Sequence, residues 1–250
     1  MSEEKSVDLL VVGSGGGGLV AALAAAAAGA KVLVVEKLPT LGGTTAYSGG
    51  AVWIPNNSLM REAGENDSFD EAWNYIDGLI GDIGPATSAA RKKAYLVEGG
   101  RMVDFLREQK LELMYCKGYS DYYASRPGGR ANGRAIEPRV FNGKRLGDDL
   151  KRLTQRPIMP GIAFQTADLS GLANGFRTWN AVRTALRVVW HTLSMSLTGR
   201  KPLSMGMGLV AQLLHALRRH DTELITGASL RHLLSCTRHT ALACTRFCCA

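Results

Sequence analysis

The 250-residue sequence predicts an α/β fold in which a doubly wound parallel sheet carries a helical and irregular insertion. Three observations support this class. Near the start, two apolar runs flank a glycine-rich turn and an Ala-rich segment, and the middle of the chain has apolar residues at helical spacing. Residues 222–234 then have the pattern of a short strand, a turn and a second strand.

The first element is the apolar run 7–12 (VDLLVV), which is typical of a strand buried on both faces of a parallel sheet and stops at Gly13. The Ala-rich segment 19–28 predicts a helix whose small side chains pack closely on that sheet, with Gly29 as its C-cap. A second strand over 31–35 ends at Glu36. The order strand, helix, strand predicts a β-α-β unit.

The turn has the pattern G-x-G-x-x-G with Gly13, Gly15 and Gly18, and Ser14 lies inside it. In this pattern the first glycine permits the tight turn, the second admits a pyrophosphate and the third lets helix and strand approach. An anion is then favoured at the helix N-terminus. Glu36, 23 residues beyond Gly13, and the following Lys37 are expected at the ribose.

This arrangement predicts dinucleotide binding, and the acid disfavours a 2′-phosphate. The alternative is a glycine-rich turn that binds nothing, which explains the acid at the strand end poorly.

A second loop, residues 41–57 (LGGTTAYSGGAVWIPNN), follows the ribose end closely. Backbone N–H groups and hydroxyls along it can bind a longer cofactor, and FAD has that length. The alternative is an ordinary loop of turn-forming residues. The candidate cofactor contacts in this loop are Gly43, Thr44, Thr45, Ser48, Gly49 and Gly50.

These two motifs, with GYSDYY at 118–123 and PGGR at 127–130, resemble the FAD-dependent 3-ketosteroid Δ1-dehydrogenases of the fumarate reductase and succinate dehydrogenase flavoprotein superfamily. The resemblance covers about residues 7–233. It implies a Rossmann-like FAD-binding domain, FAD as cofactor and a steroid-like small-molecule substrate. The implied reaction is 1,2-desaturation of a 3-ketosteroid with hydride transfer to flavin N5.

Residues 119–144 are rich in Gly, Pro, Asn and Arg, which indicates an irregular excursion of the kind kept for function. Tyr119 is the candidate catalytic residue, because the resemblance implies that a Tyr here assists a separate base. A loop Tyr packed for its ring is the alternative. Arg126, Arg130 and Arg134 suggest a carboxylate site, but their Gly-rich surroundings favour a solvated loop.

Helices are predicted over 68–80, 88–98, 100–110, 176–197 and 206–219. The last two are basic and amphipathic, so they can lie on a membrane, yet their broad apolar surface favours packing against the sheet. We expect one FAD-binding domain over 1–234, with a cofactor core at 7–57 and 222–234 and an insertion at 58–221.

Residues 235–250 (SCTRHTALACTRFCCA) show neither an acid nor a hydrophobic period. We expect a disordered tail unrelated to the family on a truncated chain, with the family's substrate domain beyond it. No metal is expected, since the spacing of five residues matches no ligand pattern: His232, Cys236, His239, Cys244 and Cys248.

Three functions stay open for such a chain. The first is a ketosteroid-type dehydrogenase with weak or no activity alone. The second is a fumarate reductase-like flavoprotein with another substrate, and the third is a non-enzymatic FAD-binding fragment.

The net charge of +8 lies entirely in residues 177–250, which hold ten Lys or Arg and two acids. No motif accompanies it that would favour nucleic-acid binding. The uncharged run 9–30 is too rich in Gly and Ala for stable membrane insertion, and no signal peptide precedes it, so a cytoplasmic chain is expected. The Cys pattern is no disulfide framework, and the oligomeric state stays open.

Overall fold

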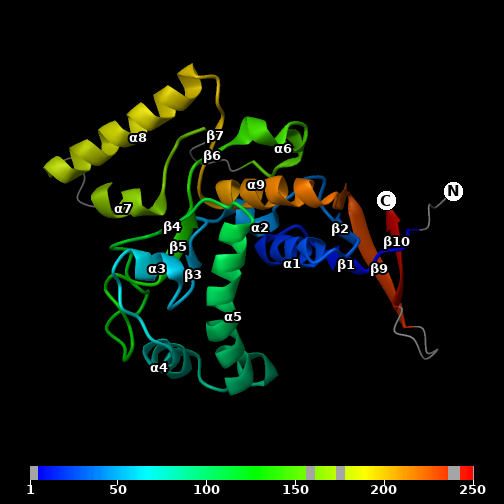
Figure 1. Cartoon of the computed structure of the whole chain (residues 1–250), viewed down its shortest axis with the longest axis horizontal. Helices are drawn as coiled ribbons and strands as arrows, with labels where there is room; N and C mark the ends of the chain where they lie inside the picture. The colour runs from blue at the N-terminus through cyan, green and yellow to red at the C-terminus, as the bar shows by residue number, and fades with distance from the viewer. Residues whose placement is uncertain (1–4, 156–160, 173–177, 236–242, 250) are drawn as a thin grey trace.

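A three-stranded parallel sheet forms the centre of the computed structural model, which describes residues 5–155, 161–172, 178–235 and 243–249. Its strands are β1 (Leu9–Val12), β2 (Val32–Glu36) and β8 (Glu223–Thr226), in the order β1-β2-β8 (Figure 1). All five residues of β2 are buried. The run 7–12, predicted to be buried on both faces, is instead the edge strand β1, where Leu9 is 36% and Val12 55% exposed, and the buried middle strand is β2. Of residues 222–234, only β8 pairs with this sheet.

Helices cover one face of this sheet. α1 (Gly16–Ala27) packs on β1 and β2, and the almost wholly buried α9 (Met205–Leu217) packs on α1. Leu19, Leu23, Val34 and Leu213 belong to the resulting core. On the other face a small cluster forms around Leu33, Val35 and Ala228, the first residue of β9 (Ala228–Ser235). The observed fold thus mixes helices and sheets, with helices on one face of the parallel sheet and a β-strand pair beside β2.

The insertion between β2 and β8 is mostly helical and fills the upper, left and lower parts of Figure 1. Its small antiparallel sheets are β3-β5-β4 and β6-β7. The elements in order are α2 (Gly43–Tyr47), β3 (Val52–Trp53), α3 (Ser58–Glu62), α4 (Phe69–Ile80), η1 (Pro85–Thr87), α5 (Ala89–Glu108), β4 (Leu113–Tyr115), β5 (Ala135–Pro138), β6 (Phe141–Asn142), η2 (Gly143–Leu146), α6 (Asp149–Arg152), α7 (Thr166–Leu172), α8 (Trp179–Leu197), β7 (Pro202–Leu203) and η4 (Arg218–His220).

The two helices predicted over 88–98 and 100–110 are one continuous helix, α5. A Cβ added at Gly99 would lie 3.2 Å from the side chain of Ile54, so this glycine lets α5 pack close to the chain after β3. The intrinsic cost of a glycine in a helix, about 1 kcal/mol, is small enough for such packing to offset. Gly99 and Gly100 therefore mark a close packing contact of α5 and do not divide it into two helices.

The expectation that the helix over 176–197 packs against the parallel sheet is wrong. α8 packs on α7 and β7, and its opposite side is exposed along its whole length. Its apolar residues are spread around the helix, but only those on one side find neighbours. The helix over 206–219, by contrast, is buried as expected.

Disorder was expected for residues 235–250, but residues 243–249 form a strand. β10 (Ala243–Cys249) pairs antiparallel with β9, with Ala243 opposite Ser235 and Cys249 opposite Ala228. Thr, Phe and Cys residues favour such a strand even where no hydrophobic period is visible. Cys236 and His239 lie outside the described residues.

Candidate functional site

The glycine-rich turn between β1 and α1 is the first part of the candidate site. Gly13 has a φ of 101°, which favours glycine, and its N–H donates to the Val35 carbonyl at 2.7 Å. A Cβ added at Gly18 would lie 2.2 Å from the Gly13 carbonyl oxygen. Gly13 and Gly18 therefore make the turn and the close helix–strand contact that the motif predicts, and Gly15 is the N-cap of α1.

The second loop reaches the N-terminus of α1. The Gly16 N–H donates to the Thr45 hydroxyl oxygen at 2.9 Å, although the two residues are 29 positions apart. First-turn N–H groups of a helix have no partner within the helix, and they carry its positive end. The structure thus brings the two predicted loops together where an anion is favoured.

Open space borders both loops. A Cβ added at Gly13, Gly17, Gly43 or Gly49 would meet no atom within 4 Å. At Gly15 the nearest atom would be the Thr45 hydroxyl oxygen, at 3.7 Å. Packing within the protein therefore does not require glycine at these positions. Glycines beside open space fit a surface that a bound pyrophosphate approaches closely.

α9 supports the second loop through two further glycines. A Cβ at Gly50 would lie 2.4 Å from the Met205 carbonyl carbon, and one at Gly206 would lie 1.9 Å from the Thr45 carbonyl oxygen. The Gly206 N–H donates to the Ser48 carbonyl at 3.1 Å. Sequence analysis missed Gly206, and the only available signal was glycine in the first turn of an apolar helix.

Glu36 lies buried at the end of β2, where its carboxylate accepts three hydrogen bonds. Ser14 donates through its N–H at 2.9 Å and its hydroxyl at 2.6 Å, and the Leu38 N–H donates at 3.0 Å. Burial is the largest single effect and raises the pKa of the Glu36 carboxyl group. Hydrogen bonds from Leu38, Ser14 and Lys37 together lower this pKa by more, so the net pKa is below its ordinary value. The carboxylate is therefore ionised near neutral pH and fixed as a hydrogen-bond acceptor at the end of β2.

The other predicted contacts differ in exposure. The Ser48 hydroxyl donates to the Thr45 carbonyl at 2.7 Å and accepts from the Gly50 N–H at 3.0 Å, so it closes the second loop. Thr44 and Lys37 are exposed. Among the described residues the Lys37 side chain has no hydrogen bond or ion pair, so the structure does not tie it to the site.

Tyr119 lies half-buried in the loop between β4 and β5. Burial raises the pKa of its phenol, and a hydrogen bond with Tyr122 raises the pKa further. The phenol is therefore protonated near neutral pH and suits a hydrogen-bond donor. The lowered pKa that a proton-abstracting Tyr requires is not found here. The neighbouring Cys116 is buried, and its burial and Glu137 raise the pKa of its thiol.

A buried ionic cluster connects this loop to β3. Arg134 is fully buried and donates to Asp67 at 2.9 Å and to Asp121 at 2.7 Å. Asp121 also accepts from the Trp53 indole N–H at 2.8 Å. The loop that carries Tyr119 is therefore fixed to the strand that follows the second glycine loop.

The expectation of a solvated arginine loop is wrong for two of its three members. Arg134 is enclosed by carboxylates and by the rings of Trp53 and Tyr75. Arg130 pairs with Glu65 and Glu71. Arg126 is exposed, as expected. Local composition suggested solvent exposure because the acidic partners lie elsewhere in the chain.

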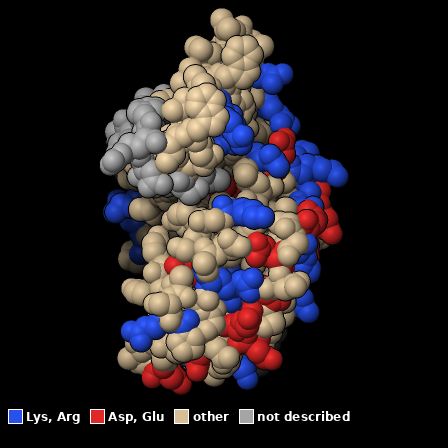
Figure 2. All heavy atoms as spheres, turned by 90° about the vertical axis from the view of Figure 1, so that its left-hand side faces the viewer, with Lys and Arg blue, Asp and Glu red and all other residues tan. Residues whose placement is uncertain are grey.

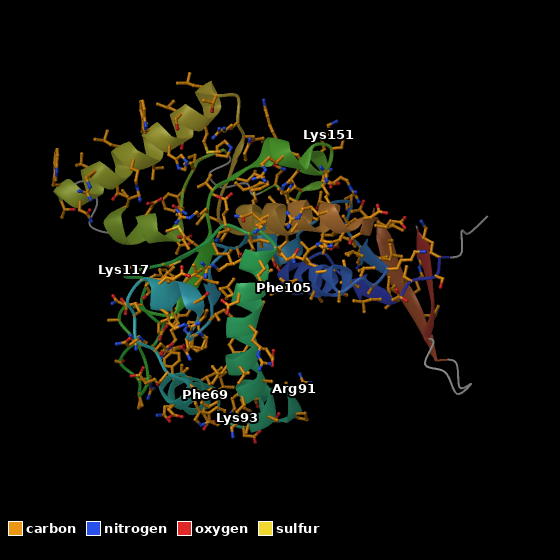
Figure 3. All side chains as sticks on the ribbon, in the orientation of Figure 1. Phe69, Arg91, Lys93, Phe105, Lys117 and Lys151 are labelled. Carbon is orange, nitrogen blue, oxygen red and sulfur yellow. The ribbon has the colours of Figure 1, made fainter. Side chains whose placement is uncertain are left out.

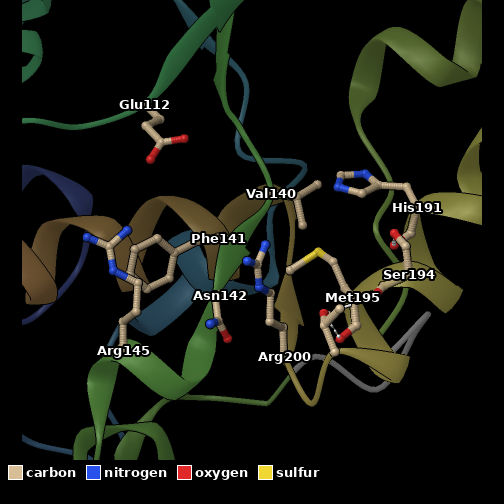
Figure 4. A pocket seen from close by; sticks show the side chains of 10 residues that line it. Glu112, Val140, Phe141, Asn142, Arg145, His191, Ser194, Met195 and Arg200 are labelled. Atoms are coloured by element: carbon tan, nitrogen blue, oxygen red, sulfur yellow. Dashed lines mark hydrogen bonds between the residues drawn. The ribbon is translucent and has the colours of Figure 1, made fainter.

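A separate hollow of about 490 Å³ lies between β6 and the inner flank of α8 (Figure 4). Its lining includes Phe141, Arg145, His191 and Arg200, and none of the predicted site residues. In the described part of the chain no group of His, Cys, Asp and Glu side chains is placed to hold a metal ion. The candidate site is thus the pair of glycine loops and the adjoining Tyr119 loop.

Comparison with known proteins agrees with this site. The family model described as FAD binding domain matches residues 8–246. The 3-oxosteroid 1-dehydrogenase of Mycolicibacterium smegmatis is 38% identical over 229 residues, which are 90% of this chain and 40% of that protein. The family match extends past residue 234, where the sequence resemblance was expected to stop.

Two solved structures have a similar fold. The 3-ketosteroid delta1-dehydrogenase of Sterolibacterium denitrificans, in complex with 1,4-androstadiene-3,17-dione, matches with a TM-score of 0.82 and 30% identity. The match covers 95% of this chain and 43% of that one. A flavocytochrome c3 fumarate reductase matches with a TM-score of 0.54 and 16% identity, over 96% of this chain and 30% of that one, which shows the fold alone.

The ionic cluster predicts a large loss of stability in Arg134→Met. This change leaves Asp67 and Asp121 buried without their cation, which costs about 3–5 kcal/mol. Urea denaturation followed by circular dichroism measures the loss. Arg126→Met, in the same loop but exposed, should change stability by less than about 0.5 kcal/mol. Equal effects of the two changes would contradict the assigned cluster.

The Glu36 contacts predict a pH-dependent stability term. Because the folded pKa of Glu36 is lowered, its contribution is present above the unfolded value of about 4.3 and disappears as pH falls through the folded value. Glu36→Gln should therefore destabilise the protein by about 1–3 kcal/mol at neutral pH, since an amide turns a donor toward Ser14. The difference from wild type should shrink on acidification in denaturation curves. A difference independent of pH would refute the assignment.

Proposed function

Because the chain belongs to the FAD binding domain family, we propose that it forms the FAD-binding part of a flavin-dependent dehydrogenase of the 3-oxosteroid 1-dehydrogenase type. The chain spans about 40% of the length of the curated relative in M. smegmatis, so the activity of a whole protein enters here as part of the proposal. The observation that carries it is the meeting of two glycine loops at the N-terminus of α1, beside open space.

The residues of the two glycine loops and Glu36 have distinct binding tasks in this proposal. The first turn of α1 receives the pyrophosphate, with Gly15 leaving room for it. The Glu36 carboxylate, at the end of β2, receives a ribose hydroxyl, and Thr45 holds the second loop over the helix end. When bound, FAD supplies the hydride acceptor, while the protein supplies position and electrostatics.

Tyr119 acts as a hydrogen-bond donor to the substrate ketone in this proposal. Its raised pKa keeps the proton on the phenol, and a donor to a carbonyl oxygen makes the neighbouring carbon more acidic. The ionic cluster fixes the loop around it. The base that removes the proton is expected outside the part of the relatives that this chain matches.

The ion pairing of the arginines in the Tyr119 loop favours a neutral substrate over a dicarboxylate. A fumarate-like substrate needs cations free to receive its carboxylates. Of the three arginines of this loop, Arg130 and Arg134 are already paired with carboxylates of the protein, and only the exposed Arg126 has no ion pair among the described residues. For a fumarate reductase-like function, the comparisons therefore support the fold alone. A ketosteroid is the preferred class of substrate.

Gly15→Val tests whether the first turn of α1 receives the pyrophosphate of FAD. The valine side chain occupies the approach of the pyrophosphate, so FAD retention should fall by at least about 100-fold, while folding persists because the protein leaves room there. Flavin absorbance per protein after gel filtration measures retention. Ala24→Val, on the exposed side of the same helix, is the control and should retain wild-type flavin. Wild-type flavin content in Gly15→Val would contradict this proposed pyrophosphate site.

Steroid turnover tests the reaction class. The FAD-loaded chain is mixed with 4-androstene-3,17-dione and an artificial electron acceptor. The expected product has lost two hydrogens and forms slowly, because in this proposal the base lies outside the chain. Tyr119→Phe should lower the rate roughly 100-fold by removing the donor. Tyr123→Phe removes a hydroxyl from an exposed ring of the same loop and should have wild-type rates. A chain that binds FAD but neither bleaches nor turns over with the steroid would support a non-enzymatic FAD-binding part instead.

A further inference from the structure

The outer side of α8 is an apolar stripe that no described residue covers. Its exposed fractions reach 79% for Trp179, 73% for Trp190 and 86% for Leu197. In Figure 3 the side chains of α8 project from the body of the molecule into empty surroundings. Exposed contiguous apolar surface of this kind marks an interaction site.

The stripe has the geometry of one continuous helix face. At about 100° per residue, six positions fall within about 40° of a single line along the helix. These are Trp179, Arg183, Leu186, Trp190, Leu193 and Leu197. Five of the six are apolar, and two are tryptophans spaced three turns apart.

The inner side anchors the helix, so the stripe is presented on a fixed support. Ala181 and Met195 are buried there, and a Cβ added at Gly171 of α7 would lie only 2.6 Å from the Thr184 hydroxyl oxygen. The Thr192 hydroxyl accepts from the Ala163 N–H at 3.0 Å. The exposed stripe is therefore the second apolar side of a packed helix and is not the face that binds α7.

The charges along α8 are all positive. Residues 178–201 contain four Lys or Arg and no acid. Arg187 pairs with Asp168, whereas Arg183, Arg200 and Lys201 form no ion pair within the described ranges. Figure 2 shows uncharged atoms at the top of the molecule, where α8 lies, with Lys and Arg along one flank.

We propose that α8 docks on an anionic lipid surface, lying parallel to it with the stripe in the headgroup region. Tryptophans favour the membrane–water interface, and basic residues beside an apolar helix face are attracted to anionic lipids. A second copy of the chain fits less well, because a two-fold contact brings cations against cations without an acid between them. No helix in the described chain is long and apolar enough to cross a membrane, so the contact is peripheral.

Vesicle cosedimentation tests this docking with the whole chain. Wild type should bind vesicles of mixed phosphatidylcholine and phosphatidylglycerol, and added salt should weaken binding. The triple variant Leu186→Ser, Trp190→Ser, Leu193→Ser should bind at least tenfold more weakly. Ile83→Ser, which alters a residue that is 84% exposed away from α8, should bind as wild type does. Equal flavin content and circular dichroism establish that the variants are folded.

Two further measurements separate the alternatives. Arg183→Glu should weaken binding to the mixed vesicles but not to neutral ones, and brominated acyl chains should quench wild-type tryptophan emission, which requires no variant. Wild type that stays in the supernatant overturns the proposal and favours coverage by another protein segment. Self-association in sedimentation velocity that the triple variant abolishes, without vesicle binding, overturns it in favour of a second copy.

Discussion

The site depends on a backbone contact between α2 and α9 that only glycine permits. Gly50 and Gly206 bring α9 against the second loop, and the Gly206 N–H fixes that loop through the Ser48 carbonyl. Without this approach Thr45 would not reach the first turn of α1. Because α9 is buried and belongs to the main core, the position of the second loop is set by the packing of the whole domain.

The parts of the fold that sequence predicted are those whose signals are local. β1, the turn, α1 and β2 follow one another within about thirty residues, and each has its own composition, cap or periodicity. The place of Glu36 at the end of β2 was predicted for the same reason, although its partners Ser14 and Leu38 were not. The prediction of a doubly wound sheet was only partly right: the sheet is parallel, but helices cover one of its faces and the β9–β10 pair lies beside β2 on the other.

The errors arise where a residue's neighbours lie far away in the sequence. Arg134 looked solvated because glycine and asparagine surround it, yet its carboxylate partners are 13 and 67 residues away. α8 looked like a core helix because its apolar residues encircle it, and composition does not say whether a helix with two apolar sides has one neighbour or two. Packing partners, unlike propensities, are a property of the folded chain.

The Ser14 hydroxyl connects the two loops through hydrogen bonds whose donor and acceptor roles are fixed. It donates to Glu36 and accepts from the Gly42 N–H at 2.9 Å, and a backbone N–H cannot exchange these roles. The end of β2 and the second loop are consequently held in register by the protein's own hydrogen bonds. In the proposed function, these two preorganised loops lose little conformational entropy when FAD binds, so more of the contact energy is expressed as affinity.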